Sequence, residues 1–279
     1  MVEHENIMQL VEAQYVELSR QERKVALKVL QEPEKIQQLS INHLAESVGV
    51  SNATITRFVK KMKCANFYEF KIQLAKVGVS PEPAVPTKGT IADDVYDFYQ
   101  KVLKATQQLL DPKTLTEVVQ LMQHSQRLYL FGLGSSGYTA NEMAQRLIRM
   151  GITAFAMTDS HMMYITSGIM QRGDVILVLS TSGNTSEVNQ AVTAAKKNGA
   201  QVIAITGFSR SPLVEQSDLA LVVKNSNFVD NSRFVNSQFA LTYVLDIITT
   251  MLLKDDHYRA NMDQTVEMIM NNKLKNKKE

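Results

Sequence analysis

The second half of the chain alternates short apolar segments with segments of helical periodicity, and no other feature of the sequence restricts the fold as strongly. The apolar segments are bounded by Gly, Asp or Ser, which is typical of buried strands, and they cover residues 127–134, 153–157, 174–180, 201–207 and 219–224. Helices are expected between them, at residues 138–150, 160–171 and 185–198. Because near-continuous apolar strands separated by helices imply a parallel sheet covered on both faces, the sequence predicts a doubly wound α/β domain with five strands.

A proline-rich stretch separates this domain from the beginning of the chain. Three of the six prolines lie in VSPEPAVPTKGT, residues 79–90. Proline fixes φ and disfavours a helix at the residue before it, so this stretch is expected to be an extended linker. We therefore expect an all-α domain at residues 1–78 and the α/β domain at residues 91–279, the latter beginning with a helical stretch over residues 91–124.

The N-terminal domain contains two short amphipathic segments joined by a glycine. Before them, Ser19 and Glu22 have the spacing of a capping box that opens a helix. Residues 41–48 and 55–62 then each repeat apolar side chains at i, i+3, i+4 and i+7, with Val48-Gly49-Val50 in between. Two such helices with a tight turn form a helix-turn-helix, the motif that places its second helix in the major groove of DNA.

The remaining face of that second helix is polar and basic. Ser51 is expected to cap the helix, and donors suited to base edges and phosphates follow it: Asn52, Thr54, Thr56, Arg57, Lys60 and Lys61. Residues 54–76 hold six basic residues and one acid, a local charge of +5 in a chain of net charge +2. A solvated helix surface is the alternative, but charge combined with this motif favours double-stranded operator DNA as a partner.

Two strands of the predicted sheet end in loops rich in hydroxyl groups. The first strand runs into GLGSSG, which contains Gly134, Ser135 and Ser136. The third runs into STSGNTS, which offers hydroxyl donors and one glycine for close backbone approach: Ser180, Ser182, Gly183, Thr185 and Ser186. If the strand order is 2-1-3-4-5, as in flavodoxin, the two loops face each other across one crevice beside helix N-termini. Because neither loop contains Lys or Arg, we expect a phosphate held by uncharged donors.

The same loops allow two other interpretations. GLGSSG matches the G-x-G-x-x-G pattern of dinucleotide-binding folds at Gly132, Gly134 and Gly137, with Asp159 near the end of the second strand. A dinucleotide site would make no use of the second hydroxyl-rich loop, however. Ser, Thr and Gly also form ordinary strand-to-helix turns, so a purely structural role is the other alternative. The lysine of a phosphate-transferring P-loop is missing.

The segments FGLGSSGYTANEMAQRLIRMG and LVLSTSGNTSEV resemble the two phosphosugar-binding segments of SIS (sugar isomerase) domains. With SINHLAESVGVSNATITRFVKKM near the N-terminus, residues 19–255 are similar to RpiR-type transcription regulators, in which a SIS domain senses a phosphorylated sugar. The resemblance implies a phosphate surrounded by Ser135, Ser136, Ser180, Ser182 and Thr185, and a DNA-facing helix carrying Ser51, Thr54 and Arg57. Cys64 and Asn66 stand where the family usually has glycines, so the turn after the reading helix is expected to differ.

SIS domains also occur in isomerases and etherases, so enzymatic activity is a separate question. Isomerising an aldose phosphate requires a general base beside C1 and C2, and the candidates are Glu142, His161 and Glu187. We expect His161 on the crevice side, either contacting a sugar hydroxyl or capping its helix. No matched acid and base stand out, so the fusion to a DNA-binding module favours a non-enzymatic receptor that alters operator binding. A phosphosugar isomerase or etherase and an NAD-binding redox sensor are the alternatives.

Composition restricts the remaining possibilities. No uncharged apolar stretch is long enough to cross a bilayer and the N-terminus has no signal pattern, so we expect a cytoplasmic protein without membrane contact. The single cysteine and five scattered histidines predict no disulfide, no metal site and no cofactor. Residues 91–124 and 232–254 have apolar faces beyond what one sheet needs, which predicts a homodimer or homotetramer.

Overall fold

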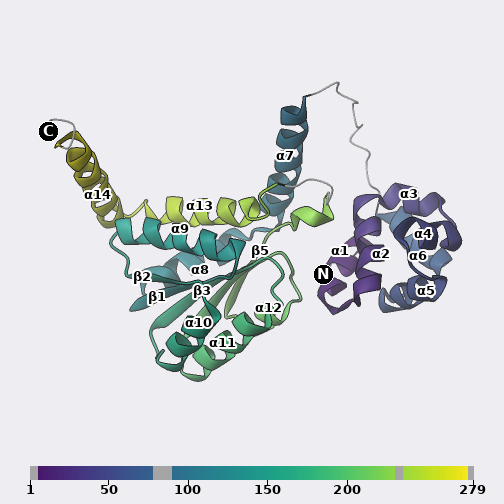
Figure 1. Ribbon diagram of the computed structural model, residues 1–279, viewed down its shortest axis with the longest axis horizontal. Coiled ribbons are helices and arrows are strands. Elements are labelled where there is room, and N and C mark those ends of the chain that lie inside the picture. The colour runs from purple at the N-terminus through teal and green to yellow at the C-terminus, as the bar shows by residue number, and fades with distance from the viewer. Residues whose placement is uncertain (1–5, 78–89, 230–234, 276–279) are drawn as a thin grey trace. The chain divides into compact units, whose positions relative to one another are not determined.

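The computed structural model describes residues 6–77, 90–229 and 235–275, and the chain divides into two compact units (Figure 1). One unit is Met1–Lys104 together with Lys224–Val235, and the other is Ala105–Val223 together with Asn236–Glu279. Apart from Thr90, the predicted linker 79–90 lies outside the described residues. The division at residue 104 falls inside helix α7 (Ile91–Leu109), so the domain boundary expected at residue 91 stays a prediction.

The first unit is helical throughout the part that the structure describes. The capping box predicted at Ser19 is confirmed, because the Ser19 side chain accepts the Glu22 N–H and the Glu22 side chain accepts the Ser19 N–H. The elements before α7 are α1 (Ile7–Gln14), the 3-10 turn η1 (Tyr15–Glu17), α2 (Arg20–Gln31), α3 (Pro33–Gln38), α4 (Ile41–Val48), α5 (Asn52–Lys61) and α6 (Phe67–Lys76).

Helices α4 and α5 form the predicted helix-turn-helix. Gly49 ends α4 in the left-handed conformation with φ 65°, and Ser51 starts α5 by accepting the Thr54 N–H at 3.2 Å. The apolar face of α5 is buried, as its spacing predicts, and Phe58 packs edge-on against Phe70 of α6 with ring centroids 5.6 Å apart. This packing leaves the polar face of α5 for solvent or a partner.

The turn after α5 contains Cys64 and Asn66 and no glycine. Lys63 adopts the left-handed conformation, with φ 58°, and is the one non-glycine residue with positive φ in the described chain. Asn66 is extended and caps α6 by accepting the Glu69 N–H. Cys64 is buried and its thiol donates to the Met62 carbonyl oxygen. The absent glycines are therefore accommodated by placing the strained torsion on an exposed lysine.

The second unit is a five-stranded parallel sheet with the order β2-β1-β3-β4-β5, which confirms the predicted fold class and the flavodoxin-like order. All seven residues of β3 are buried, and β3 pairs with β1 on one side and β4 on the other, so the central strands match the long apolar runs. The strands are β1 (Arg127–Phe131), β2 (Ala154–Met157), β3 (Asp174–Ser180), β4 (Gln201–Thr206) and β5 (Leu219–Val222).

Helices cover both faces of this sheet (Figure 1). One face carries α10 (Ser160–Gly168), α11 (Ser186–Lys197) and α12 (Pro212–Gln216), and apolar side chains of β1, β3 and β4 form a continuous core with them. The other carries α8 (Pro112–Gln123), α9 (Ser135–Arg149) and the mostly buried α13 (Phe239–Leu252). The 3-10 turn η2 (Ser226–Phe228) follows β5, and α14 (Asp256–Lys275) ends the described chain.

Several helical boundaries differ from the predicted ones; α10, for example, ends at Gly168 rather than at residue 171. The single stretch expected over residues 91–124 is two helices, α7 and α8, because Asp111 caps a new helix and Pro112 occupies its first turn. Helix α9 begins at Ser135 rather than at residue 138, so the serines of the first loop already belong to the helix. Part of the predicted helix over residues 232–254 lies outside the described residues, and α13 covers Phe239–Leu252.

Candidate functional site

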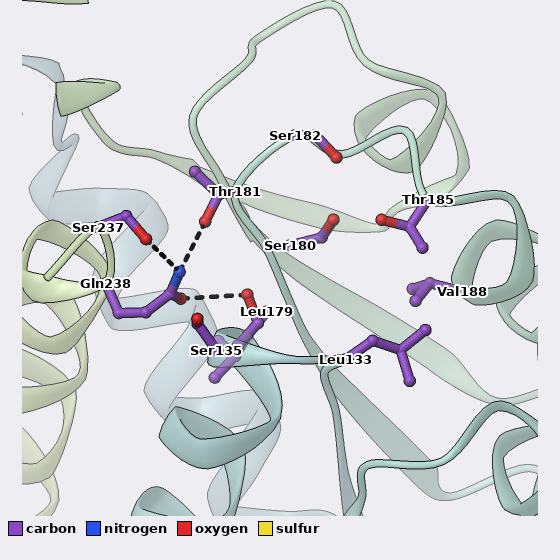
Figure 2. A pocket seen from close by; sticks show the side chains of 11 residues that line it. Leu133, Ser135, Leu179, Ser180, Thr181, Ser182, Thr185, Val188, Ser237 and Gln238 are labelled. Atoms are coloured by element: carbon purple, nitrogen blue, oxygen red, sulfur yellow. Dashed lines mark hydrogen bonds between the residues drawn. The ribbon is translucent and has the colours of Figure 1, made fainter. Parts of the chain in front are cut away.

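A cavity of about 250 Å³ lies where β1 and β3 end, between the two hydroxyl-rich loops (Figure 2). One wall is formed by Ser135 and Ser136 and the other by residues 180–182 with Thr185, while Leu133, Leu179 and Val188 add apolar surface. The strand order brings β1 and β3 together as neighbours, so the two loops face each other across one cavity. This volume suits a small metabolite rather than a dinucleotide.

Three helices begin at the cavity without a capping hydrogen bond from the side chain of their N-cap residue. The N-cap of α9 is Gly134, which has no side chain, and the side chains of Thr185 and Gln238, the N-caps of α11 and α13, make no capping hydrogen bond. By contrast, Asp159 and Ser211 cap the neighbouring helices α10 and α12. Uncapped helix N-termini offer free backbone donors and a positive dipole end, so α9 and α11 favour an anion in the cavity.

The serine hydroxyls of the second loop are oriented by backbone donors. Ser180 Oγ accepts the Gly183 N–H at 3.1 Å, and Ser182 Oγ accepts the Asn184 N–H at 3.2 Å. Each oxygen is thus used as an acceptor, and its O–H proton is left to donate to a ligand. Within the described residues, the hydroxyls of Ser135 and Thr185 make no recorded hydrogen bond, so they are also available as donors.

Each loop passes so close to neighbouring atoms at one position that only a glycine fits there. Gly183 has φ +60°, and a Cβ there would lie 2.2 Å from Ser211 Oγ. A Cβ on Gly132 would lie 2.5 Å from the Ser136 carbonyl oxygen. The β1–α9 loop therefore needs a glycine at position 132 because it passes close to the backbone of its own helix. This packing accounts for a glycine of the G-x-G-x-x-G pattern without a bound dinucleotide.

Gln238 is a cavity residue that the sequence analysis missed. Its Oε1 accepts the Ser136 hydroxyl at 3.1 Å, and its Nε2 donates to Thr181 Oγ1 at 3.1 Å and Ser237 Oγ at 3.2 Å. Figure 2 shows this side chain reaching across from α13 to both loops. No local pattern indicates such a role, because Gln238 and Ser136 are 102 positions apart in sequence.

The candidate general bases do not line the cavity. His161 is exposed in the first turn of α10, and Asp159 makes the capping bond, so the expected crevice position and the cap role of His161 are both unsupported. Glu142 pairs with Arg146 on the surface of α9. Glu187 is exposed in the first turn of α11, and hydrogen bonds from its own backbone N–H and from the Ser186 hydroxyl lower its pKa. None of the residues that line this cavity carries a titratable side chain.

The polar face of α5 is the candidate DNA interface. Ser51, Asn52, Thr56, Arg57 and Lys60 are exposed there, as predicted from their spacing. The Asn52 amide also donates to Asn42 Oδ1 at 2.6 Å, which links α5 to α4.

Thr54 and Lys61 do not both face outward with free donors, as the sequence analysis expects for the DNA-facing surface. Thr54 is only 5% exposed, and its Oγ1 lies 3.0 Å from Ser51 Oγ and accepts from Arg57 Nη2 at 3.3 Å. It therefore orients its neighbours instead of facing outward. Lys61 Nζ lies 2.8 Å from the buried carboxylate of Glu22 on α2, so this ion pair within the domain partly neutralises the lysine charge. Burial raises the pKa of Glu22, but hydrogen bonds from Lys61 and Ser19 outweigh it and hold that pKa below its ordinary value.

Within the described residues, no helix is both long and apolar enough to traverse a bilayer. The same part of the chain contains no cluster of His, Cys, Asp and Glu suited to a metal ion.

Comparisons with known proteins agree with this architecture. Residues 5–79 match the helix-turn-helix domain of the rpiR family, and residues 121–251 match the SIS domain. The chain is 31% identical to an uncharacterized HTH-type transcriptional regulator of Haemophilus influenzae, over 99% of this chain and 100% of that protein. It is 29% identical to the HTH-type transcriptional regulator HexR of Pseudomonas aeruginosa, over 88% of each.

Among solved structures, Vibrio vulnificus NanR complexed with ManNAc-6P has the same fold, with a TM-score of 0.60 and 24% identity over 95% of this chain and 98% of that one. The helix-turn-helix, the five-stranded parallel sheet and the full-length relatives lead to one assignment. This chain belongs to the RpiR family of helix-turn-helix transcriptional regulators that carry a SIS domain.

Proposed function

We propose that the cavity between the β1–α9 and β3–α11 loops binds the phosphate of a phosphorylated sugar, and that this binding alters the affinity of the protein for its operator DNA. The observation that carries the proposal is the convergence of the hydroxyls of Ser135, Ser180, Ser182 and Thr185 with two uncapped helix N-termini on one cavity. Phosphate oxygens accept several hydrogen bonds, and neutral donors at helix N-termini supply them without a cation.

The chemistry of the cavity supports a receptor over an enzyme. Isomerisation needs a general base near C1 and C2 of the sugar, and the lining residues offer only hydroxyl, amide and apolar side chains. Glu142, His161 and Glu187 lie outside the lining. The two relatives described above, with which the chain aligns over most of its length, are named as transcriptional regulators, which supports the same choice.

A phosphorylated amino sugar is a reasonable first probe, because the similar NanR structure was determined with ManNAc-6P. The cavity volume of about 250 Å³ also favours one monosaccharide phosphate over a larger ligand.

On the DNA side, we propose that Asn52, Thr56 and Arg57 contact base edges while Ser51 and Lys60 contact phosphates. Helix-turn-helix proteins read two half-sites about 34 Å apart as dimers, so a homodimer or homotetramer acting in the cytoplasm is part of the proposal. Ligand binding would then change the spacing of the two reading helices.

The test is a titration of the purified full-length protein on the DNA upstream of its own gene, followed by fluorescence anisotropy. ManNAc-6P, fructose 6-phosphate and other sugar phosphates are added in turn, with the unphosphorylated sugars and inorganic phosphate for comparison. The proposal predicts that at least one sugar phosphate changes DNA affinity while its unphosphorylated form does not. If no sugar phosphate changes it, or if the protein turns one over, the proposed receptor function is wrong.

A further inference from the structure

One side chain joins both walls of the candidate phosphate cavity. Gln238 is 5% exposed, and its amide accepts from Ser136 in the β1–α9 turn and donates to Thr181 in the β3–α11 loop. It reaches the cavity from a third segment, the start of α13, where it makes no capping bond to its own helix. The amide therefore acts as a bridge between the two loops that would hold the ligand.

A phosphate and this bridge compete for the same proton. The Ser136 hydroxyl donates to Gln238 Oε1, and a phosphate oxygen can only accept hydrogen bonds. For Ser136 to donate to the ligand, its bond to Gln238 has to break. The Gln238 Nε2 group, by contrast, is a donor and gains from a charged acceptor, since charge-assisted hydrogen bonds are about twice as strong as neutral ones. Ligand binding thus removes one end of the bridge and redirects the other.

Segment 224–229, which precedes α13 in sequence, packs within the helical unit. Lys224 forms an ion pair with Glu12 of α1, Gln31 Nε2 of α2 donates to the Asn227 carbonyl oxygen at 2.6 Å, and the buried Phe228 ring packs edge-on against Tyr15 at 5.0 Å. These contacts come from segment 224–229, which follows β5 and precedes α13 in sequence. The segment therefore belongs to the unit that carries the reading helix, although the strand before it belongs to the sheet.

Contacts continue from this segment to the reading helix. Helix α2, which holds Asn227 through Gln31, also carries Glu22, and Glu22 is paired with Lys61 on α5 at 2.8 Å. Segment 224–229 is thus connected to α5 through α2 by a hydrogen bond and an ion pair, and the covalent chain from this segment to α13 runs through residues 230–234, which lie outside the described residues.

We propose that occupancy of the cavity controls the DNA-binding unit through Gln238: the Ser136–Gln238–Thr181 bridge is intact in the empty protein, and ligand binding opens it and changes the position of Gln238 at the start of α13. The inference rests on the proposed phosphosugar receptor function and specifies how that site controls DNA binding.

The first experiment removes the bridge in the full-length protein. Gln238→Ala lacks both amide contacts, so without ligand its DNA affinity should equal that of the ligand-saturated wild type within about twofold. Its further response to ManNAc-6P or fructose 6-phosphate should fall below about twofold, from a wild-type response in the usual range of about 5- to 150-fold. Thr181→Val keeps the side-chain shape, removes one end of the bridge and should shift DNA affinity in the same direction, which covers the case in which Gln238→Ala does not fold.

The second experiment removes a contact of segment 224–229 with α2, away from the cavity. Gln31→Ala removes the hydrogen bond to Asn227, whereas Asn227→Ala keeps it, because the acceptor is the backbone carbonyl oxygen. Gln31→Ala should bind the sugar phosphate like the wild type, by isothermal titration calorimetry, yet show a DNA response reduced at least about threefold. Asn227→Ala should keep the full response.

The outcomes separate this inference from the function on which it rests. If the wild type responds to no sugar phosphate, the receptor function fails and the inference fails with it. If the wild type responds, and Gln238→Ala and Gln31→Ala keep both the wild-type affinity for DNA and its full response, the receptor function stands and the role of Gln238 is wrong.

Discussion

The backbone at Gly183 passes so close to Ser211 that a Cβ on residue 183 would lie 2.2 Å from the Ser211 hydroxyl oxygen. Ser211 is fully buried and caps α12 by accepting the Val214 N–H, so it cannot move away freely. The position of the β3–α11 loop is thus fixed by the helix that follows the next strand.

Gly183→Ala should therefore deform this loop. The left-handed torsion costs an alanine about 1–2 kcal/mol, and the clash with Ser211 adds to it. We expect a lower melting temperature and at least about a tenfold loss of sugar-phosphate affinity, measured by differential scanning calorimetry and isothermal titration calorimetry. Gly168→Ala is the matched control, because a Cβ at this position of α10 meets no atom within 4 Å. Equal effects of the two substitutions would contradict this explanation of the loop.

Ser182→Ala should weaken binding of the phosphate without unfolding the protein. The serine is exposed at the cavity, and a hydrogen bond to a charged group contributes about 1.5–3 kcal/mol, or about 10- to 150-fold in affinity. Isothermal titration calorimetry with a sugar phosphate measures the change. Ser209→Ala, in the exposed loop after the neighbouring strand β4, should bind like the wild type. An unchanged Ser182→Ala affinity would remove this hydroxyl from the site.

Arg57→Ala should reduce operator affinity by about 1–3 kcal/mol if its guanidinium reads a base edge, and the loss should be smaller on unrelated DNA. Lys60→Ala should weaken binding to operator DNA and to unrelated DNA equally, because a phosphate contact carries no sequence information. It should also reduce the slope of log affinity against log salt concentration by about 1. Anisotropy titrations at several salt concentrations distinguish the two. Lys197→Ala removes the same charge at the end of α11 and should leave both affinities unchanged.

The pair formed by Glu22 and Lys61 should make the stability of the helical unit depend on pH. The pKa of Glu22 is lowered in the folded protein from its ordinary value of 4.5. Its contribution is therefore complete above about pH 4.5 and is lost as the pH falls through the lower, folded-state value. Urea unfolding should show wild type more stable than Glu22→Gln near neutral pH, by about 1–3 kcal/mol, with the difference shrinking at acid pH. A difference that stays constant from pH 7 to pH 3 would exclude the effect.

The sheet and its loops could be predicted because their signals are local. β3 is a run of buried residues, mostly apolar, that ends at Ser180, and the alternation of strands and helices indicates a parallel sheet, while the order of its strands comes from the likeness to flavodoxin. The break between α7 and α8 could also have been found, since Asp111 followed by Pro112 is a helix-start signal.

The missed features depend on contacts between distant parts of the chain. Gln238 meets Ser136 only because α13 packs next to α9, and no local periodicity encodes that neighbourhood. The spacing of Thr54 on α5 allowed an outward position, but the residue is buried and its hydroxyl is used in hydrogen bonds with Ser51 and Arg57. The sequence predicts His161 on the crevice side, yet it is exposed in the first turn of α10 and does not line the cavity.

A crystal structure of the full-length protein with a bound sugar phosphate would decide the central proposal. We expect the phosphate between the two loops, within hydrogen-bond distance of the hydroxyls of Ser135, Ser180, Ser182 and Thr185, with the Ser136–Gln238 bond broken. A phosphate bound elsewhere, with this cavity empty and the bond from Ser136 to Gln238 intact, would contradict it.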